Sequence, residues 1–134
     1  MDKASTTSYR FYKKERLKSH TIIARLFEKG QSFGRYPLRL VWLEMARDEK
    51  AQVQVAFSVP KKKFKSAVDR NRIKRQLREA WRLNKHLLYG KIKMRDSSYV
   101  FMIIYVAKEK VSYREIEKNA QRMIQKFVEV SAVG

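Results

Sequence analysis

Apolar residues recur at helical spacing in two segments, one near each end of the chain. The first predicted helix covers 19–29, and its apolar side consists of Ile22, Ile23, Leu26 and Phe27. Ser19 can accept hydrogen bonds from the first free backbone N–H groups, and Gly30 can end this helix. The last predicted helix opens at Ser112, which has capping-box spacing to Glu115. Its core stripe comprises Ile116, Ala120, Met123, Ile124, Phe127 and Val128.

Shorter runs with alternating or continuous apolar residues predict the strands. Residues 38–43 and 52–59 read as an antiparallel pair joined by a turn at 46–50, and Pro60 ends the second strand. Residues 99–107 are almost continuously apolar, with β-branched and aromatic side chains, which is typical of a central strand. A further short strand is expected near 32–35, and a loop is expected from Gly90 to Ser98.

A basic amphipathic helix is predicted between the second and third of these strands. One side carries Asn71, Arg75, Arg78 and Arg82, and the opposite side carries Ile73, Leu77 and Ala80. Asp69 is the expected N-cap, since a carboxylate there accepts from free N–H groups and suits the positive end of the helix dipole. Asn71 has two interpretations, a second cap near the N-terminus or a polar contact to RNA.

The element order α-β-β-(β)-α-β-α predicts an α+β fold, a two-layer sandwich of helices on a sheet. At 134 residues and 44% hydrophobic content, we expect a single domain over 1–134 with one modest core. Residues 1–15 are polar and basic with scattered aromatics, so we expect this N-terminal segment to be extended or partly disordered before it docks.

Composition removes several classes of function. The absence of Cys excludes disulfides and thiolate metal sites, and His20 and His86 lie far apart in the sequence. We therefore expect no metal site, no protein-bound cofactor and no catalytic residue in the protein. There is no long apolar run and no hydrophobic N-terminal segment, so we expect a cytoplasmic protein without a membrane partner.

The net charge of +19 is concentrated in residues 61–85, where 11 Lys and Arg stand against Asp69 and Glu79. Helical faces that serve only solubility mix both signs, whereas this stripe contains no acid. Such a face would repel itself without a polyanion, and an ordinary solvated helix face is the alternative interpretation. Because guanidinium groups match phosphate oxygens and purine edges, the preference for Arg favours a nucleic acid.

The ordered motifs in this region resemble the signature of the bacterial ribonuclease P protein subunit. They are Phe57-Ser58-Val59, Lys61-Lys62-Lys63, Arg70-Asn71-Arg72-Ile73-Lys74-Arg75 and Leu77-Arg78-Glu79-Ala80. Earlier in the chain, Arg16-Leu17-Lys18 and Phe27-Glu28-Lys29-Gly30 occur in the family's order. The resemblance implies a left-handed βαβ crossover, as in the ribosomal protein S5 domain 2-like fold, against the usual rule for parallel strands.

The resemblance also implies a function. The family's protein assists a catalytic RNA that removes the 5′ leader from precursor tRNA by endonucleolytic cleavage, with Mg²⁺ held mainly by the RNA. The implied partners are the ribonuclease P catalytic RNA and precursor tRNA, with the protein monomeric in the holoenzyme. The implied contacts to catalytic RNA are Lys61, Lys62, Lys63, Lys65, Arg70, Asn71, Arg72, Lys74, Arg75 and Arg78.

A second implied surface binds the leader in a groove between the first helix and the open sheet face. Its residues are Phe11, Lys13, Arg16, Lys18, Ile23, Phe27, Arg39 and Val41. Ile23 and Val41 stand where relatives often have aromatics, so base stacking would depend on Phe27 and Phe11. Ordinary core packing is the alternative interpretation of Ile23, Phe27 and Val41. The loop Phe64-Lys65-Ser66 also departs from the Gly-containing stretch common in the family.

Three other classes share part of this pattern. A ribosomal or other structural RNA-binding protein would assemble with its RNA and leave precursor processing unchanged. A nuclease acting alone would cleave without an RNA partner, but it would need a His pair or a carboxylate cluster. A DNA-binding module would need a two-helix reading head before the basic helix, and the sequence predicts none.

Overall fold

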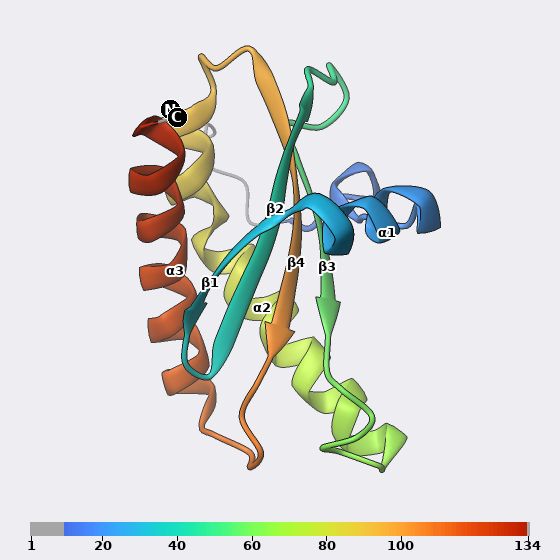
Figure 1. Cartoon of the computed structure of the whole chain (residues 1–134). Helices are drawn as coiled ribbons and strands as arrows, with labels where there is room; N and C mark the ends of the chain where they lie inside the picture. Colours follow the sequence, from blue (N-terminus) through green and yellow to red (C-terminus); the bar gives the residue numbers. More distant parts are fainter. Residues whose placement is uncertain (1–9, 134) are drawn as a thin grey trace.

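The protein folds as a mixed four-stranded sheet with two long helices on one face and one short helix on the other (Figure 1). We describe a computed structural model, in which residues 10–133 are placed and side chains are described through residue 131. The elements in chain order are η2 (Lys13–Glu15), α1 (His20–Lys29), β1 (Gln31–Arg35), β2 (Leu38–Ala46), β3 (Val53–Ser58), α2 (Ala67–Ile92), β4 (Ser97–Tyr105) and α3 (Tyr113–Val133).

The strand order is β1-β2-β4-β3, with β2 antiparallel to both β1 and β4. The last pair, β3 and β4, is parallel and is connected through α2. In Figure 1, β3 and β4 both point down, β4 lies to the left of β3, and α2 passes behind the sheet. A connection of this kind, from β3 through α2 to β4, is left-handed. The predicted α+β sandwich, its added first strand and its unusual crossover are confirmed. The predicted antiparallel pairing of 38–43 with 52–59 is wrong, because β4 lies between β2 and β3 and pairs with both.

The main core lies between the sheet and the layer formed by α2 and α3. Trp42, Phe101 and Phe127 meet there edge to face, with ring centroids 5.0 Å apart for Trp42–Phe127 and 4.8 Å for Phe101–Phe127. Because side chains alternate along a strand, the neighbours of these residues face the opposite side. On that open face a smaller buried cluster forms under α1, and its members are Leu17, Leu26, Val41, Val100 and Met102.

The ends of the long helix differ from the prediction. Helix α2 continues through Gly90 to Ile92, so Gly90 is helical and not part of the expected loop. Gly90 is exposed, so its helical position places no demand on neighbouring side chains. Strand β4 begins at Ser97 and ends at Tyr105, two residues earlier at each end than predicted. Burial of Leu88 and Ile92 against the core accounts for the longer helix, since packing overrides the weak helix propensity of glycine.

The N-cap of α2 is Ser66 and not Asp69. The Ser66 hydroxyl accepts a hydrogen bond from the Asp69 backbone N–H at 3.3 Å, which places Asp69 in the first turn. Asn71 is the fifth residue of the helix and is exposed, so its interpretation as a cap is wrong as well. The caps predicted at Ser19 and Ser112 are confirmed, with hydroxyls that accept from Ile22 and Glu115 at 3.2 Å each.

Gly30 ends α1, as predicted, but the reason is space and not backbone conformation. Its φ of −70° is open to every residue type. A side-chain Cβ at this position would lie 2.3 Å from the Leu26 carbonyl oxygen and 3.0 Å from the Trp42 carbonyl oxygen. The close approach of this residue to the last turn of α1, and to β2 on its other side, therefore requires glycine.

Candidate nucleic-acid interface

The basic turn before α2 is fixed by one buried aromatic and one arginine. Phe64 is buried and packs against the Tyr105 ring at a centroid distance of 5.8 Å. The Arg70 guanidinium donates to the carbonyl oxygens of Phe64 and Lys65 at 2.7 and 2.8 Å. These contacts hold the turn at the N-terminus of α2, where its exposed lysines, Lys61, Lys62, Lys63 and Lys65, stand together. Arg70, predicted as an RNA contact, is thus half-buried and bonded to the turn.

Beyond this turn, α2 presents a row of exposed cations. Arg72, Arg75 and Arg78 are exposed, Lys74 is half-buried, and Asn71 lies exposed among them. Within residues 10–131, no carboxylate lies within salt-bridge distance of Arg72, Arg75 or Arg78. The structure therefore brings the predicted contacts to catalytic RNA together on one end of the molecule. Arg72, Arg75 and Arg78 are exposed to solvent there, whereas Arg70 is bonded to the turn.

The acid-free stripe is shorter than the sequence predicted. Arg82 forms an ion pair with Glu79, one turn earlier in the helix, at 2.6 Å. The hydrogen bond from Arg82 lowers the pKa of the Glu79 carboxyl, so the pair is ionised at neutral pH. The row of cations without an acidic partner ends at Arg78.

The loop between β4 and α3 lies beside the start of α2, a neighbour that sequence reasoning missed. Lys63 Nζ donates to the Val106 carbonyl oxygen at 2.7 Å, and Lys110 Nζ lies 2.8 Å from the Asp69 carboxylate. Lys108 and Lys110 are exposed there, on either side of the exposed Glu109. Parallel strands bring the end of β4 to the same end of the sheet as the end of β3.

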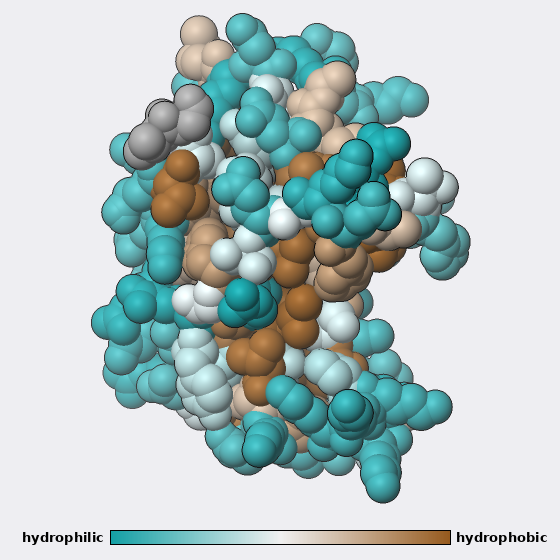
Figure 2. All heavy atoms as spheres, in the orientation of Figure 1, coloured by the Kyte–Doolittle hydropathy of each residue, from teal (hydrophilic) through white to brown (hydrophobic). Residues whose placement is uncertain are grey.

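The second predicted surface lies where α1 crosses the open face of the sheet. Figure 2 shows brown, hydrophobic atoms over the sheet next to α1 and teal, hydrophilic atoms at the lower right, where α2 begins. Phe27 is 55% exposed, so its interpretation as a core residue is wrong. Ile23 is half-buried and Val41 is 8% exposed, and both pack in the cluster under α1. Arg39 is exposed, and its guanidinium donates to the Ser32 hydroxyl at 3.0 Å.

The remaining predicted leader contacts lie on the segment before α1. Its exposed cations, Lys13, Arg16 and Lys18, follow the outer edge of β3, where the Leu17 N–H donates to the Val55 carbonyl oxygen at 3.0 Å. Phe11 packs on Phe57 at 5.9 Å between centroids, and Arg16 lies over the Phe11 ring at 5.3 Å. Since Phe57 faces the helical layer, Phe11 is not on the same face as Phe27. The predicted leader contacts therefore extend from β2 across the open face of the sheet to the outer edge of β3.

Two further properties of the described chain bear on its chemistry. Among residues 10–133, no three His, Cys, Asp or Glu side chains are grouped as they would be around a metal ion. None of the helices in this range has the length and apolar content that crossing a membrane requires.

An α+β sandwich with a basic helix end and an aromatic residue beside an open sheet face is typical of a small RNA-binding protein. The family model described as Ribonuclease P matches residues 11–128. The chain belongs to the ribonuclease P protein family, the protein components of a ribonucleoprotein endoribonuclease that takes part in tRNA processing.

Curated relatives and solved structures agree with this assignment. The ribonuclease P protein component of Porphyromonas gingivalis is 36% identical over 120 residues, which cover 90% of this chain and 88% of the relative. That of Chlorobium phaeobacteroides is 35% identical over 106 residues, 73% of each chain. The fold matches the RNase P proteins of Thermotoga maritima and Staphylococcus aureus with TM-scores of 0.66 and 0.63. Those alignments, at 20% and 24% identity, cover 84% and 87% of this chain and 96% of each structure.

Proposed function

We propose that this chain binds the catalytic RNA of ribonuclease P and that the complex removes the 5′ leader from precursor tRNA by endonucleolytic cleavage. The observation that carries the proposal is the row of exposed cations on the turn and first half of α2, where Arg72, Arg75 and Arg78 have no carboxylate partner within residues 10–131. Each phosphate contact made by such a cation releases counterions from the RNA.

The surface where α1 crosses the open sheet face is proposed to bind the unpaired leader. Phe27 offers an exposed ring on α1, Arg39 is an exposed cation on β2, and Lys18 and Arg16 are exposed on the segment that leads into α1. Unpaired nucleotides suit this surface because any base can stack on an aromatic ring while cations follow the phosphates. Phe11 is the less accessible of the two aromatics, since it is half-buried between Phe57 and Arg16.

We assign bond cleavage to the RNA. Hydrolysis of a phosphodiester by divalent cations needs oxygen ligands that are grouped around the ions, and RNA phosphates supply them. The Mg²⁺ of the holoenzyme is accordingly held mainly by RNA, and no protein residue is assigned a catalytic role. The protein acts by screening the repulsion between two RNAs, by holding the leader and by supporting the active RNA conformation. It acts as a monomer in the holoenzyme, in the cytoplasm.

Reconstitution tests this proposal. Purified protein, freed of RNA by nuclease treatment and ion exchange, is added to a bacterial ribonuclease P RNA and a precursor tRNA at low Mg²⁺. We expect the protein to raise the rate of leader removal, and to cleave nothing when the catalytic RNA is omitted. Metal-dependent cleavage by protein alone would support a stand-alone nuclease. Absence of any effect on the catalytic RNA would support a structural RNA-binding protein instead.

A further inference from the structure

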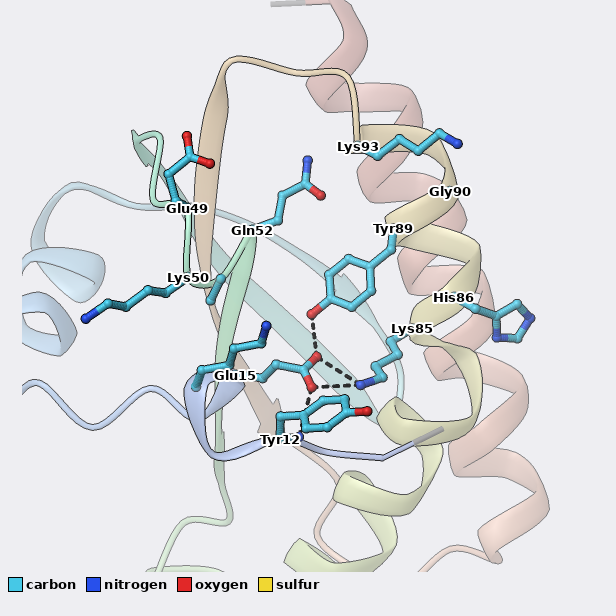
Figure 3. Close-up of a pocket in the computed structure, with 12 residues that line it drawn as sticks. Tyr12, Glu15, Glu49, Lys50, Gln52, Lys85, His86, Tyr89, Gly90 and Lys93 are labelled. Carbon is cyan, nitrogen blue, oxygen red and sulfur yellow. Dashed lines mark hydrogen bonds and ion pairs between the residues drawn. The ribbon is translucent and has the colours of Figure 1, made fainter. Parts of the chain in front are cut away.

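A buried ion pair joins the segment before α1 to the C-terminal half of α2. Lys85 Nζ lies 2.8 and 3.0 Å from the two carboxylate oxygens of Glu15, and the Tyr89 hydroxyl donates to the same carboxylate at 2.5 Å. In Figure 3 these three side chains point toward one another from the segment and from α2. Glu15 is 3% exposed and Lys85 is 2% exposed. Lys and Glu are almost never buried to this degree unless they are paired.

The network holds the backbone of the segment as well as its side chain. The Glu15 carboxylate accepts from the Tyr12 backbone N–H at 2.9 Å, and Lys85 donates to the carbonyl oxygen of Arg10. Lys85 Nζ also lies 5.3 Å from the centre of the Tyr12 ring. Burial, and then the bond to Glu15, raise the pKa of Tyr89, so its hydroxyl stays a protonated donor. One lysine of α2 thus contacts residues 10, 12 and 15 together.

The same segment is attached on its other side to β3. Gln54 Nε2 donates to the Lys14 carbonyl oxygen at 3.2 Å, and the Leu17 N–H donates to Val55 at 3.0 Å. Residues 10–17 therefore bridge α2 and the outer edge of the sheet. The bonds to β3 come from residues 14 and 17, whereas the bonds to α2 fix residues 10–15.

We propose that Glu15, Lys85 and Tyr89 are positioning residues for leader binding: the network sets the course of residues 10–16 and with it the places of the exposed Lys13 and Arg16. This inference rests on the proposed function, in which those two cations contact the leader. Glu15 and Lys85 are too deeply buried to touch RNA themselves, so their effect passes through the segment.

When the network is broken, we expect residues 10–16 to move before α2 does. With Lys85 changed to Met, the Glu15 carboxylate would be buried without a cation, which is strongly unfavourable. Helix α2 is held by buried Trp81 and Leu88, whereas Glu15 belongs to a short segment that can move into water. We therefore expect residues 10–16 to leave α2, while the first half of α2 keeps its exposed cations in place.

The test compares Lys85→Met and Tyr89→Phe with the matched control Lys91→Met. Lys91 is exposed on the same helix, so this change removes the same charge without touching the network. Each variant is assembled with a bacterial ribonuclease P RNA, and its affinity is measured for precursor tRNA with a leader of several nucleotides and for mature tRNA. Affinity for the catalytic RNA, thermal melting and trypsin cleavage after Lys13, Lys14 and Arg16 are measured on the same preparations.

We expect Lys85→Met to weaken binding of the leader-bearing substrate by about tenfold or more, the scale of one lost base stack or two lost phosphate contacts. Mature tRNA and catalytic RNA should bind as in the Lys91→Met control, and trypsin should cleave within residues 13–16 faster. Tyr89→Phe, which keeps the ring and the ion pair, should change leader affinity and trypsin cleavage in the same direction by a smaller factor.

Several results would overturn the inference. One is leader affinity equal to the control, whether or not trypsin cleaves faster, because segment position would then not matter to the leader. Another is an equal loss for all three RNAs together with a lower melting temperature in both variants, because the network would then only support the fold. If the unaltered protein showed no preference for the leader-bearing substrate, the proposed function would fail at this surface before the variants were compared.

Discussion

Leu26 and Phe27 are neighbours in α1 and have opposite environments: Leu26 is fully buried against the open face of the sheet, while Phe27 is 55% exposed. One residue along a helix turns the side chain by about a quarter of the circumference, enough to move from the buried cluster to its margin. The apolar side of α1 is therefore wider than its contact with the sheet. The part of this apolar side that does not contact the sheet is the exposed ring of Phe27.

This arrangement predicts different outcomes for two neighbouring alanine substitutions. Phe27→Ala should weaken holoenzyme binding to leader-bearing precursor tRNA by about 1 to 3 kcal/mol, the contribution of one base stack. Its melting temperature should stay close to that of the unaltered protein, since the ring is largely exposed. Leu26→Ala should lower the free energy of unfolding by about 2 to 5 kcal/mol, as for other buried leucines.

Thermal melting and affinities for precursor and mature tRNA, measured on both variants, check this prediction. Mature tRNA should bind the Phe27→Ala holoenzyme normally. A large drop in the melting temperature of Phe27→Ala without a leader-specific loss would remove Phe27 from the leader surface.

Local signals predicted the short elements well and the ends of the long helix poorly. Ser19 and Ser112 lie directly before periodic apolar runs, and both are caps. At α2 the predicted cap is Asp69, whereas the observed cap is Ser66, three residues before it. The cap is decided by where the buried stripe begins, and the sequence leaves that open by one turn. The loop predicted to begin at Gly90 was wrong for a related reason. Ile92, two residues beyond Gly90, is buried, and this burial keeps the last turn of the helix in place.

The grouping of exposed cations on α2 could be predicted from local sequence, whereas contacts between distant parts of the chain could not. A continuous motif places Arg72, Arg75 and Arg78 on one helix, so periodicity and resemblance were enough to group them. The pairing of Glu15 with Lys85 joins residues 70 positions apart, and no local pattern marks it. The approach of Lys110 to Asp69 likewise depends on which strand ends the chain places together. Such contacts depend on how distant parts of the chain are brought together by the fold, so local sequence patterns do not predict them.

The exposed arginines of α2 should bind phosphates directly. Arg72→Ala combined with Arg75→Ala should weaken binding to catalytic RNA, and the slope of log affinity against log salt concentration should fall by about one for each lost contact. The matched control is Lys118→Ala with Arg122→Ala, which removes two exposed cations from α3, outside both predicted surfaces.

Filter binding across a series of salt concentrations measures both quantities, and circular dichroism checks that the fold is intact. The control pair should change the slope less. Natively folded Arg72/Arg75 variant protein with unaltered affinity and slope would show that the row of arginines is only a solvated helix face.

The cap of α2 gives a prediction about stability. Ser66→Ala removes the acceptor for the Asp69 N–H and should lower the free energy of unfolding by about 0.5 to 2 kcal/mol. Asp69→Asn keeps the cap and breaks the partly exposed ion pair with Lys110, which should cost about 0 to 1 kcal/mol. Urea titration of both variants measures the difference. Asp69→Ala, which would remove a cap as well as the ion pair, should cost no more than Asp69→Asn, and a larger loss would return the capping role to Asp69.

Arg70 and Arg72 should respond differently to replacement by lysine. Both changes keep the positive charge, but the Arg70 guanidinium donates to two backbone carbonyl oxygens of the turn at 2.7 and 2.8 Å, while Arg72 is exposed. A lysine at 70 has a single ammonium group in place of the planar fork and does not reproduce this geometry. Arg70→Lys should therefore lower the free energy of unfolding by about 1 to 3 kcal/mol, and Arg72→Lys should leave it unchanged.

Catalytic RNA should bind Arg70→Lys more weakly, because the lysines of the loosened turn are no longer held together. Calorimetric melting and RNA affinity at one salt concentration distinguish the two roles: equal melting temperatures for both variants would show that Arg70 does not fix the turn.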